Sequence, residues 1–110
     1  MSEASDALAA RLRALLARRK GIVEKRMFGG VGFMLRGNML IGTTSKGAML
    51  VRVGPDRQSE ALKRKGAFVM TMGERAMSGF IAVDEKGLED TALKSWIAYA
   101  DTYVKGLPDK

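Results

Sequence analysis

The stretch from residue 22 to residue 53 constrains the fold most, because short apolar runs alternate there with tight turns. Gly37-Asn38 separates two apolar runs, and Ser45-Lys46-Gly47 precedes a third run, Ala48–Val53. Turns this short between apolar runs indicate hairpins, and strands joined by hairpins are antiparallel. Ala48–Val53 carries apolar residues on both of its faces, which predicts a central strand covered on at least part of each side.

Helical patterns flank these strands. Leucines at positions i, i+4, i+7 and i+8 predict a first helix over about Asp6–Lys20, and an apolar stripe predicts a last helix over about Leu88–Lys105. A short middle helix is expected between about Pro55 and Lys65, and two further strands over about Phe68–Met72 and Phe80–Val83. The predicted fold class is therefore α+β: an antiparallel β-sheet of about five to six strands, flanked by an N-terminal and a C-terminal helix plus a short middle helix.

Length and hydropathy bound the organisation of the chain. Residues 1–110 are expected to form a single domain, because domains most often run to about 100–150 residues. No apolar run reaches the roughly 18–20 residues that a membrane-spanning helix needs. Glu3 and Asp6 precede the first basic residue, unlike the start of a secretory signal. We expect a cytoplasmic protein without a membrane partner.

The sequence contains neither histidine nor cysteine. Most zinc sites, thiol nucleophiles and imidazole acid–base catalysts are thereby excluded. The paired acids Asp84-Glu85 and Glu89-Asp90 surround the start of the last predicted helix, where negative charge favours the helix dipole. Trp96 is most simply a core anchor. We therefore predict no metal, no cofactor and no enzymatic activity.

Positive charge is concentrated in the first part of the chain. The chain carries 19 Lys and Arg against 12 Asp and Glu, and residues 1–65 hold 14 of the basic and 5 of the acidic residues. Two basic triplets stand at predicted helix ends, each followed by glycine, and both features favour a helix C-terminus. The alternative is contact with an anion or a nucleic acid. The residues concerned are Arg18, Arg19, Lys20, Lys63, Arg64 and Lys65.

Glycines and methionines indicate how the faces of the predicted sheet are packed. Gly29-Gly30-Val31-Gly32 leads into a predicted strand, whereas a phosphate-binding loop leads into a helix. We interpret these glycines as a tight turn, a bulge or close backbone packing. The chain has 8 methionines, and three helices need not cover both faces of a sheet. An uncovered, methionine-bearing face would be a surface for a homodimer or another partner.

Several segments resemble one known family, in order along nearly the whole chain. Met49–Val53 is similar to the central strand of the TfoX/Sxy N-terminal domain, Ala76–Val83 to its late strand and Leu93–Ile97 to its final helix. An earlier segment resembles the family's signature Arg-Met-Phe-Gly-Gly. The matching residues are Arg26, Met27, Phe28, Gly29 and Gly30.

The resemblance implies an α+β fold and a bacterial regulatory role. The best-known members regulate natural competence, are thought to act with a cyclic-AMP receptor protein at promoters, and carry a second, C-terminal domain. This chain contains no counterpart of that second domain, so we expect a stand-alone N-terminal-like domain. The family supplies no established catalytic residues.

Three functional hypotheses follow, in order of support. The first is a non-enzymatic regulatory or interaction module that acts through protein–protein contacts, with a transcription regulator as the partner that the resemblance implies. The second is a basic, largely sequence-independent nucleic-acid-binding domain. The third is an enzyme, which would require a deep pocket that gathers Arg26, Arg52 and acidic residues.

Overall fold

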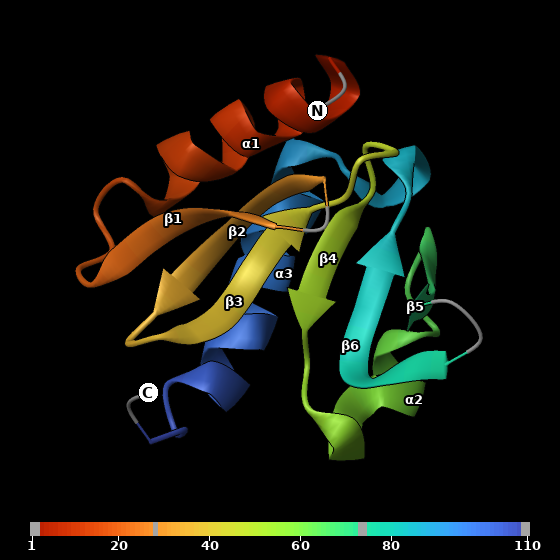
Figure 1. Cartoon of the computed structure of the whole chain (residues 1–110). Coiled ribbons are helices and arrows are strands. Elements are labelled where there is room, and N and C mark those ends of the chain that lie inside the picture. The colour runs from red at the N-terminus through yellow and green to blue at the C-terminus, as the bar shows by residue number, and fades with distance from the viewer. Residues whose placement is uncertain (1–2, 28, 73–74, 109–110) are drawn as a thin grey trace.

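An antiparallel sheet with helices on one side organises the chain (Figure 1). The computed structural model describes residues 3–27, 29–72 and 75–108. The six strands of the described sheet are β1 (Ile22–Met27), β2 (Gly30–Leu35), β3 (Asn38–Thr43), β4 (Met49–Arg52), β5 (Ala67–Met72) and β6 (Arg75–Val83). The described helices are α1 (Glu3–Leu16), α2 (Gln58–Ala61) and α3 (Asp90–Val104), with 3₁₀ turns η1 (Pro55–Arg57) and η2 (Glu85–Gly87). The predicted α+β class is confirmed.

The strand order is β1-β2-β3-β4-β6-β5, which places β4 inside the sheet and leaves β1 and β5 at its edges. Val51 of β4 pairs with Ile41 of β3 on one side and with Ile81 of β6 on the other. Met49 and Leu50 point to opposite faces of β4, and both are fully buried. The prediction of a central strand covered on both sides is therefore confirmed.

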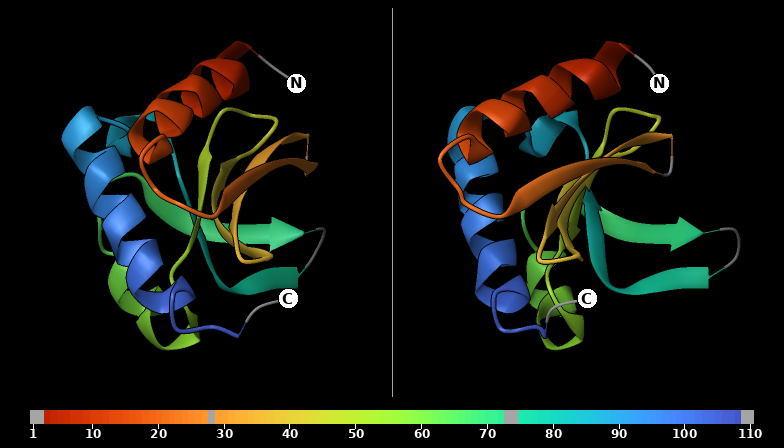
Figure 2. Two further views of the ribbon diagram at one scale, coloured as in Figure 1. Left: turned by 90° about the vertical axis from the view of Figure 1, so that its left-hand side faces the viewer. Right: turned by 60° about the vertical axis from the view of Figure 1, so that its left-hand side comes forward.

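The larger hydrophobic core lies between the helices and one face of the sheet. Figure 2 shows α1 and α3 against this face, while the β5–β6 hairpin extends away from them. Leu12 of α1 and Trp96 of α3 meet Phe33 and Val51 of the sheet in one cluster. Full burial of side chains of this size contributes about 1.5–3 kcal/mol each. Trp96 is thus the core anchor that the sequence predicted.

A smaller apolar cluster lies on the sheet face away from the helices. Met34, Met39 and Leu50 are buried there, and the partly buried Met27 and Met70 pack against them. The methionine-bearing face expected from the sequence exists, but Met34 and Met39 are only 8% and 7% exposed. The methionines therefore fill this face more than they present it to solvent.

Glycines allow the methionines to lie flat on the strands. A Cβ atom on Gly32 would stand 2.7 Å from Sδ of Met27, the side chain that covers it. A Cβ atom on Gly30 would overlap the backbone carbonyl oxygen of Thr43 on the neighbouring strand. The interpretation of the glycine run as close packing is confirmed, and the run is no phosphate loop.

The first helix differs from its predicted boundaries. α1 begins at Glu3 and ends at Leu16, four residues before the predicted end at Lys20. The backbone N–H of Arg19 bonds to the carbonyl of Leu16, and Gly21 at φ 85° turns the chain into β1. Sequence periodicity could not predict this early end, because the end is set by the turn that brings the chain back to the edge strand β1.

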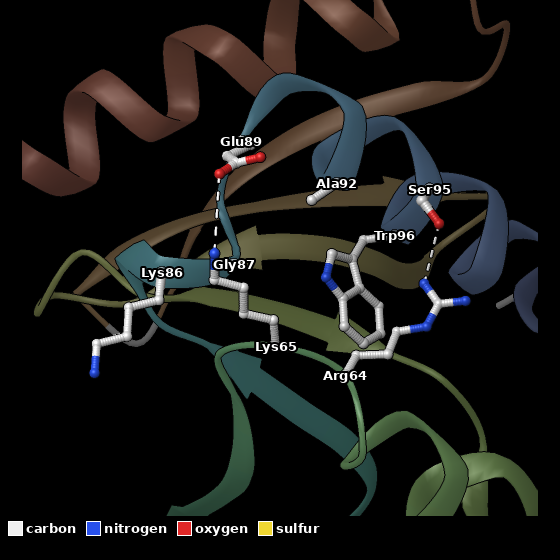
Figure 3. A pocket seen from close by; sticks show the side chains of 8 residues that line it. All are labelled: Arg64, Lys65, Lys86, Gly87, Glu89, Ala92, Ser95 and Trp96. Carbon is white, nitrogen blue, oxygen red and sulfur yellow. Dashed lines mark hydrogen bonds and ion pairs between the residues drawn. The ribbon is translucent and has the colours of Figure 1, made fainter.

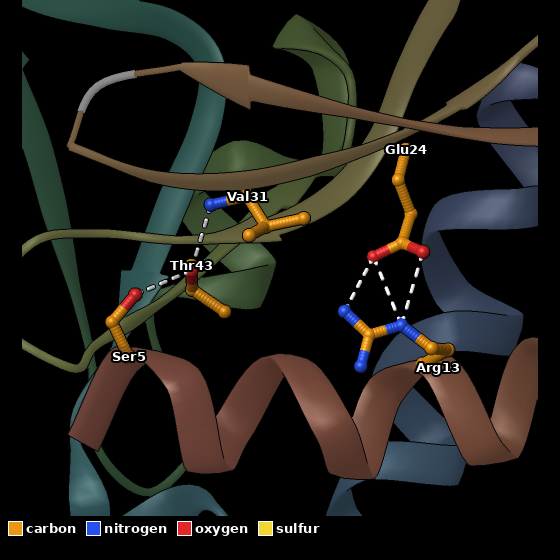
Figure 4. A network of polar contacts seen from close by, with 5 residues as sticks. All are labelled: Ser5, Arg13, Glu24, Val31 and Thr43. Carbon is orange, nitrogen blue, oxygen red and sulfur yellow. Dashed lines mark hydrogen bonds and ion pairs between the residues drawn. The ribbon is translucent and has the colours of Figure 1, made fainter. Parts of the chain in front are cut away.

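Two polar contacts fix α1 on the sheet (Figure 4). The buried Ser5 hydroxyl lies 2.8 Å from the hydroxyl of Thr43, which accepts the backbone N–H of Val31 at 3.0 Å. At the other end of α1, Arg13 donates to both carboxylate oxygens of Glu24 on β1, at 2.7–3.1 Å. The hydrogen bonds from Arg13 hold the pKa of Glu24 below its ordinary value.

The glycine packing predicts unequal effects of two alanine substitutions. Gly30→Ala should destabilise the protein by about 1–3 kcal/mol, because the backbone of Thr43 on the neighbouring strand must move away. Gly32→Ala should cost less than about 1 kcal/mol, because the flexible Met27 side chain can shift away. Urea unfolding followed by circular dichroism measures both. Equal losses in the two variants would contradict this account of Gly30 and Gly32.

The Arg13–Glu24 pair predicts a pH-dependent stability difference for Glu24→Gln. Since the folded-state pKa of Glu24 lies below the unfolded value of about 4.3, the stabilisation is present above that value. It is lost as the pH falls through the folded-state pKa. The unaltered protein should melt slightly above the variant at pH 7, and the gap should close on acidification below about pH 4. Thermal melts across pH 3–7 measure the gap, and a gap independent of pH would contradict the prediction.

Candidate functional site

The first basic triplet lies in the turn between α1 and β1, and its members have different surroundings. Arg19 forms an ion pair with Asp101 of α3 at 2.7 Å. Lys20 lines a shallow hollow of about 360 Å³ together with Arg36 and Lys105. Arg18 is exposed. Because α1 ends at Leu16, the triplet lies in the turn that follows the helix and not in its last helical turn, where the sequence predicts it.

The second basic triplet also lies beyond its helix. α2 ends at Ala61, earlier than the predicted end at Lys65, so the triplet occupies the turn before β5. Its central member, Arg64, lies over two aromatic rings of α3, 4.7 Å from the centroid of Trp96 and 4.5 Å from that of Tyr99. The same guanidinium donates to Oγ of Ser95 at 3.0 Å. Arg64 therefore links the turn to α3.

The other two members of this triplet differ in position. Nζ of Lys65 lies 4.0 Å from Oε1 of Glu89, and both side chains are about three-quarters exposed. Lys63 is exposed and lines none of the hollows described here. The pair between Lys65 and Glu89 is long and hydrated, so it contributes little stability and leaves both charges free to move.

The two triplets do not form one continuous basic surface. Lys20 lies near Lys105, just past the end of α3, whereas Lys65 lies near Glu89, just before its start. The helical segment between these positions is about 24 Å long at 1.5 Å per residue. The six basic residues predicted as anion contacts are thus split into two separate regions.

A pocket of about 150 Å³ opens beside the start of α3 (Figure 3). We call it the α3 pocket. Its wall carries three cationic side chains and one carboxylate, so its local net charge is +2. The lining residues are Arg64, Lys65, Lys86, Gly87, Glu89, Ala92, Ser95 and Trp96.

The indole of Trp96 is the most buried side chain of the α3 pocket, at 2% exposure. Figure 3 shows its nitrogen edge turned toward Lys65 and Gly87, and Arg64 near the opposite edge of the ring. Within the described parts of the chain, its Nε1–H donates to no acceptor. Every fully enclosed side-chain nitrogen or oxygen there has a hydrogen-bond partner, so this nitrogen is not fully enclosed. The N–H is therefore accessible from the pocket as an unused donor.

Glycines bring the two loops of the α3 pocket together. Gly66, at φ 80°, accepts the backbone N–H of Asp84 through its carbonyl at 2.9 Å. A Cβ atom on Gly87 would overlap the carbonyl oxygen of Lys65. These close approaches hold Lys65 and Lys86 on neighbouring loops at the mouth of the pocket.

A second arginine braces the same face of α3. The guanidinium of Arg57 lies 3.6 Å from the ring centroid of Tyr99 and donates to the carbonyl oxygen of that residue at 3.2 Å. The ring of Tyr99 in turn meets Trp96 edge-on, with centroids 5.7 Å apart. Stacked cations and aromatics of this kind attract by about 0.5–2 kcal/mol. Arg57 and Tyr99 thereby support the Trp96 ring that lines the α3 pocket.

The two edge strands of the sheet differ in charge. β1 carries three exposed charged residues in succession, Glu24, Lys25 and Arg26. β5 carries no charged residue, and its Phe68 and Val69 are 43% and 42% exposed. Charges on an edge strand discourage pairing with other chains, whereas an uncharged apolar edge invites it.

A groove of about 260 Å³ follows β5 on one side and the β3–β4 turn on the other. We call it the β5 groove. Phe68 and Met70 form its apolar wall, Ala82 of β6 lies between, and Lys46 brings a positive charge. Sequence reasoning did not select this strand, although the uncharged run Ala67–Met72 carries the signal.

The signature residues have structural positions. Arg26 is exposed on β1, Met27 covers Gly32, and Gly29 takes φ 74° in the turn. Phe28 lies outside the described residues. Arg52 lies between the rings of Phe80 and Tyr103, at 5.4 and 5.8 Å from their centroids, on the central strand β4. The pocket of Arg26, Arg52 and acids that an enzyme would have required is not among the described pockets.

The sequence predicted only some of the residues that line the α3 pocket as candidate site residues. Arg64 and Lys65 were candidates, but Lys86, Ser95 and Trp96 were not assigned to a site. No local spacing connects them with the triplet, because α3 joins it only through tertiary packing. Among the described residues, no three His, Cys, Asp or Glu side chains gather as a metal site, and none of the described helices is long and apolar enough to cross a membrane.

The comparisons with known proteins agree with the signature and the fold. Residues 14–102 match the TfoX N-terminal domain family. Neither the curated proteins nor the solved structures gave a significant match. The match spans the region from within α1 to near the end of α3, which contains the whole sheet. The chain therefore belongs to the TfoX N-terminal domain family.

Proposed function

We propose that this domain is a non-enzymatic interaction module that binds an extended segment of another protein along the free edge of β5. The supporting observation is the contrast between the two edges of the sheet. β1 is guarded by Glu24, Lys25 and Arg26, whereas β5 offers unpaired backbone groups beside half-exposed apolar side chains. An added strand gains main-chain hydrogen bonds from such an edge.

The side chains of the β5 groove define the chemistry of the partner segment. Alternate apolar residues of an added strand would pack on Phe68 and Met70, because strand side chains alternate between faces. Among the described residues that line the groove, Lys46 alone is charged, and the whole chain carries a net charge of +7. The partner segment is therefore apolar at alternate positions and acidic in net charge, which complements the positive charge of the chain. The family suggests a transcription regulator as the protein that contains it.

The residue inventory supports a binding role over catalysis. The chain has neither histidine nor cysteine, which are the commonest acid–base and nucleophilic groups at neutral pH. Catalytic carboxylates are recognisable by a pKa displaced by burial or by a second carboxylate. The pKa of Glu24 is lowered, but the cause there is the hydrogen bonds from its structural partner Arg13.

Nucleic-acid binding remains the alternative prediction. Two observations argue against it. The two basic triplets are separated by the length of α3, and Arg19 already forms an ion pair with Asp101. Titration of labelled duplex DNA at 50 and 200 mM salt measures it. We expect no binding at either salt, and a loss of affinity of about 10³–10⁵-fold between them would support the alternative.

Site-specific photo-crosslinking in cells tests the β5 edge directly. A photoreactive phenylalanine analogue replaces Phe68 in one variant and Val23 on the opposite edge strand in a second, since both positions are exposed. We expect an adduct with another protein from position 68 and none from position 23. Val69→Lys, combined with the probe at position 68, should abolish the adduct, while Val23→Lys should leave it intact.

The crosslinking outcomes distinguish a different protein from a second copy of this chain as the partner at the β5 edge. Mass spectrometry should locate the attached peptide in an extended apolar segment that contains an acidic residue. Equal adducts from both edges, or an adduct that survives Val69→Lys, would contradict the proposal. An adduct with a second copy of this chain would show a homodimer in place of a different partner, and would also overturn it.

A further inference from the structure

The α3 pocket contains a hydrogen-bond donor, on an otherwise buried side chain, that the fold does not use. Trp96 is 2% exposed, and its Nε1–H has no acceptor within the described parts of the chain. Native structures leave few polar groups without a partner, so an N–H that no protein acceptor pairs is satisfied by water or by a ligand. Here the N–H is accessible from a pocket in which an acceptor atom can be placed (Figure 3).

The charges around this donor select the acceptor. Lys65 approaches the nitrogen edge of the indole from the neighbouring loop, and Arg64 lies against the ring. Arg64 donates one hydrogen bond to Oγ of Ser95, and it has no carboxylate partner among the described residues. Of the described residues that line the pocket, Glu89 alone is a carboxylate; it is three-quarters exposed and lies 4.0 Å from Lys65. An anion therefore gains more from Arg64, Lys65 and Lys86 than it loses to Glu89.

We propose that the α3 pocket binds the phosphate group of a phosphate monoester. One phosphate oxygen accepts the Nε1–H of Trp96, and Lys65 neutralises charge after turning away from Glu89. Arg64 and Lys86 add positive charge from the wall. A monoester suits the pocket better than a diester, because it carries about −1.5 to −2 at pH 7 and has three free acceptor oxygens.

The proposed anion site is separate from the β5 edge. Its residues belong to the α2–β5 turn, η2 and α3, whereas the β5 groove lies between β5 and the β3–β4 turn. The two sites have only the short loop around Gly66 between them. Failure of one proposal therefore leaves the other standing.

Trp96 is the only tryptophan of the chain, so its fluorescence reports on the pocket directly. The full chain is titrated with inorganic phosphate, O-phospho-L-serine and dimethyl phosphate, each at constant ionic strength adjusted with sodium chloride. We expect saturable changes with the first two probes and none with the diester. An acetylated and amidated phosphoserine tripeptide then tells a phosphorylated polypeptide from a free small molecule as the source of the monoester.

Charge variants on one loop provide matched controls. Lys65→Gln should weaken O-phospho-L-serine binding about five- to tenfold, whereas Lys63→Gln removes the same charge outside the pocket and should change it less than twofold. Glu89→Gln should tighten binding about two- to fivefold, because it removes the opposing carboxylate. Equal losses in the two lysine variants would show general charge attraction and would overturn the proposal.

Trp96→Phe tests the indole donor itself, with the rise in melting temperature as its readout. A ligand that binds only the folded state stabilises it by RT ln(1 + [L]/Kd), so at a fixed ligand concentration a weaker affinity gives a smaller rise in melting temperature. The rise caused by O-phospho-L-serine should fall sharply in the Phe variant, and lowered stability of the variant does not affect this comparison. An undiminished rise, or no fluorescence response in the unaltered protein, would overturn the proposal.

Discussion

The packing of α3 against the sheet is the interaction on which the rest of the structure depends. Leu93, Trp96 and Val104 bury their side chains against the strands, and each is at most 2% exposed. The same helix receives Arg57 and Arg64 on its outer aromatic face and Arg19 near its end. Because three separate loops attach to it, α3 fixes where the basic residues of those loops lie.

The aromatic residues of α3 have two roles at once. Trp96 fills the core with its ring, while its N–H edge meets the α3 pocket. Tyr99 is also buried, yet its ring supports Arg57 and Arg64. A guanidinium held over a ring keeps its charge and most of its donors, so the fold positions cations without neutralising them.

The glycines of β2 serve packing in this chain. Gly30 and Gly32 lie where Thr43 and Met27 approach too closely for a side chain. The result is a sheet whose far face is closed by its own methionines and needs no helix. That closure leaves β5 as the apolar edge, because Phe68 and Val69 lie beyond the methionine cluster.

The sequence by itself determined the fold class, the antiparallel pairing of the hairpins, the burial of Trp96 and the packing role of the glycines. Each of these follows from local periodicity, short turns and side-chain size, which act between near neighbours in the chain. Only the tertiary structure decided that α1 ends at Leu16, that Arg64 stacks on Trp96 and that β5 is an uncharged edge. Those features depend on which distant segments meet, and contacts between distant segments leave no spacing in the sequence from which they can be predicted.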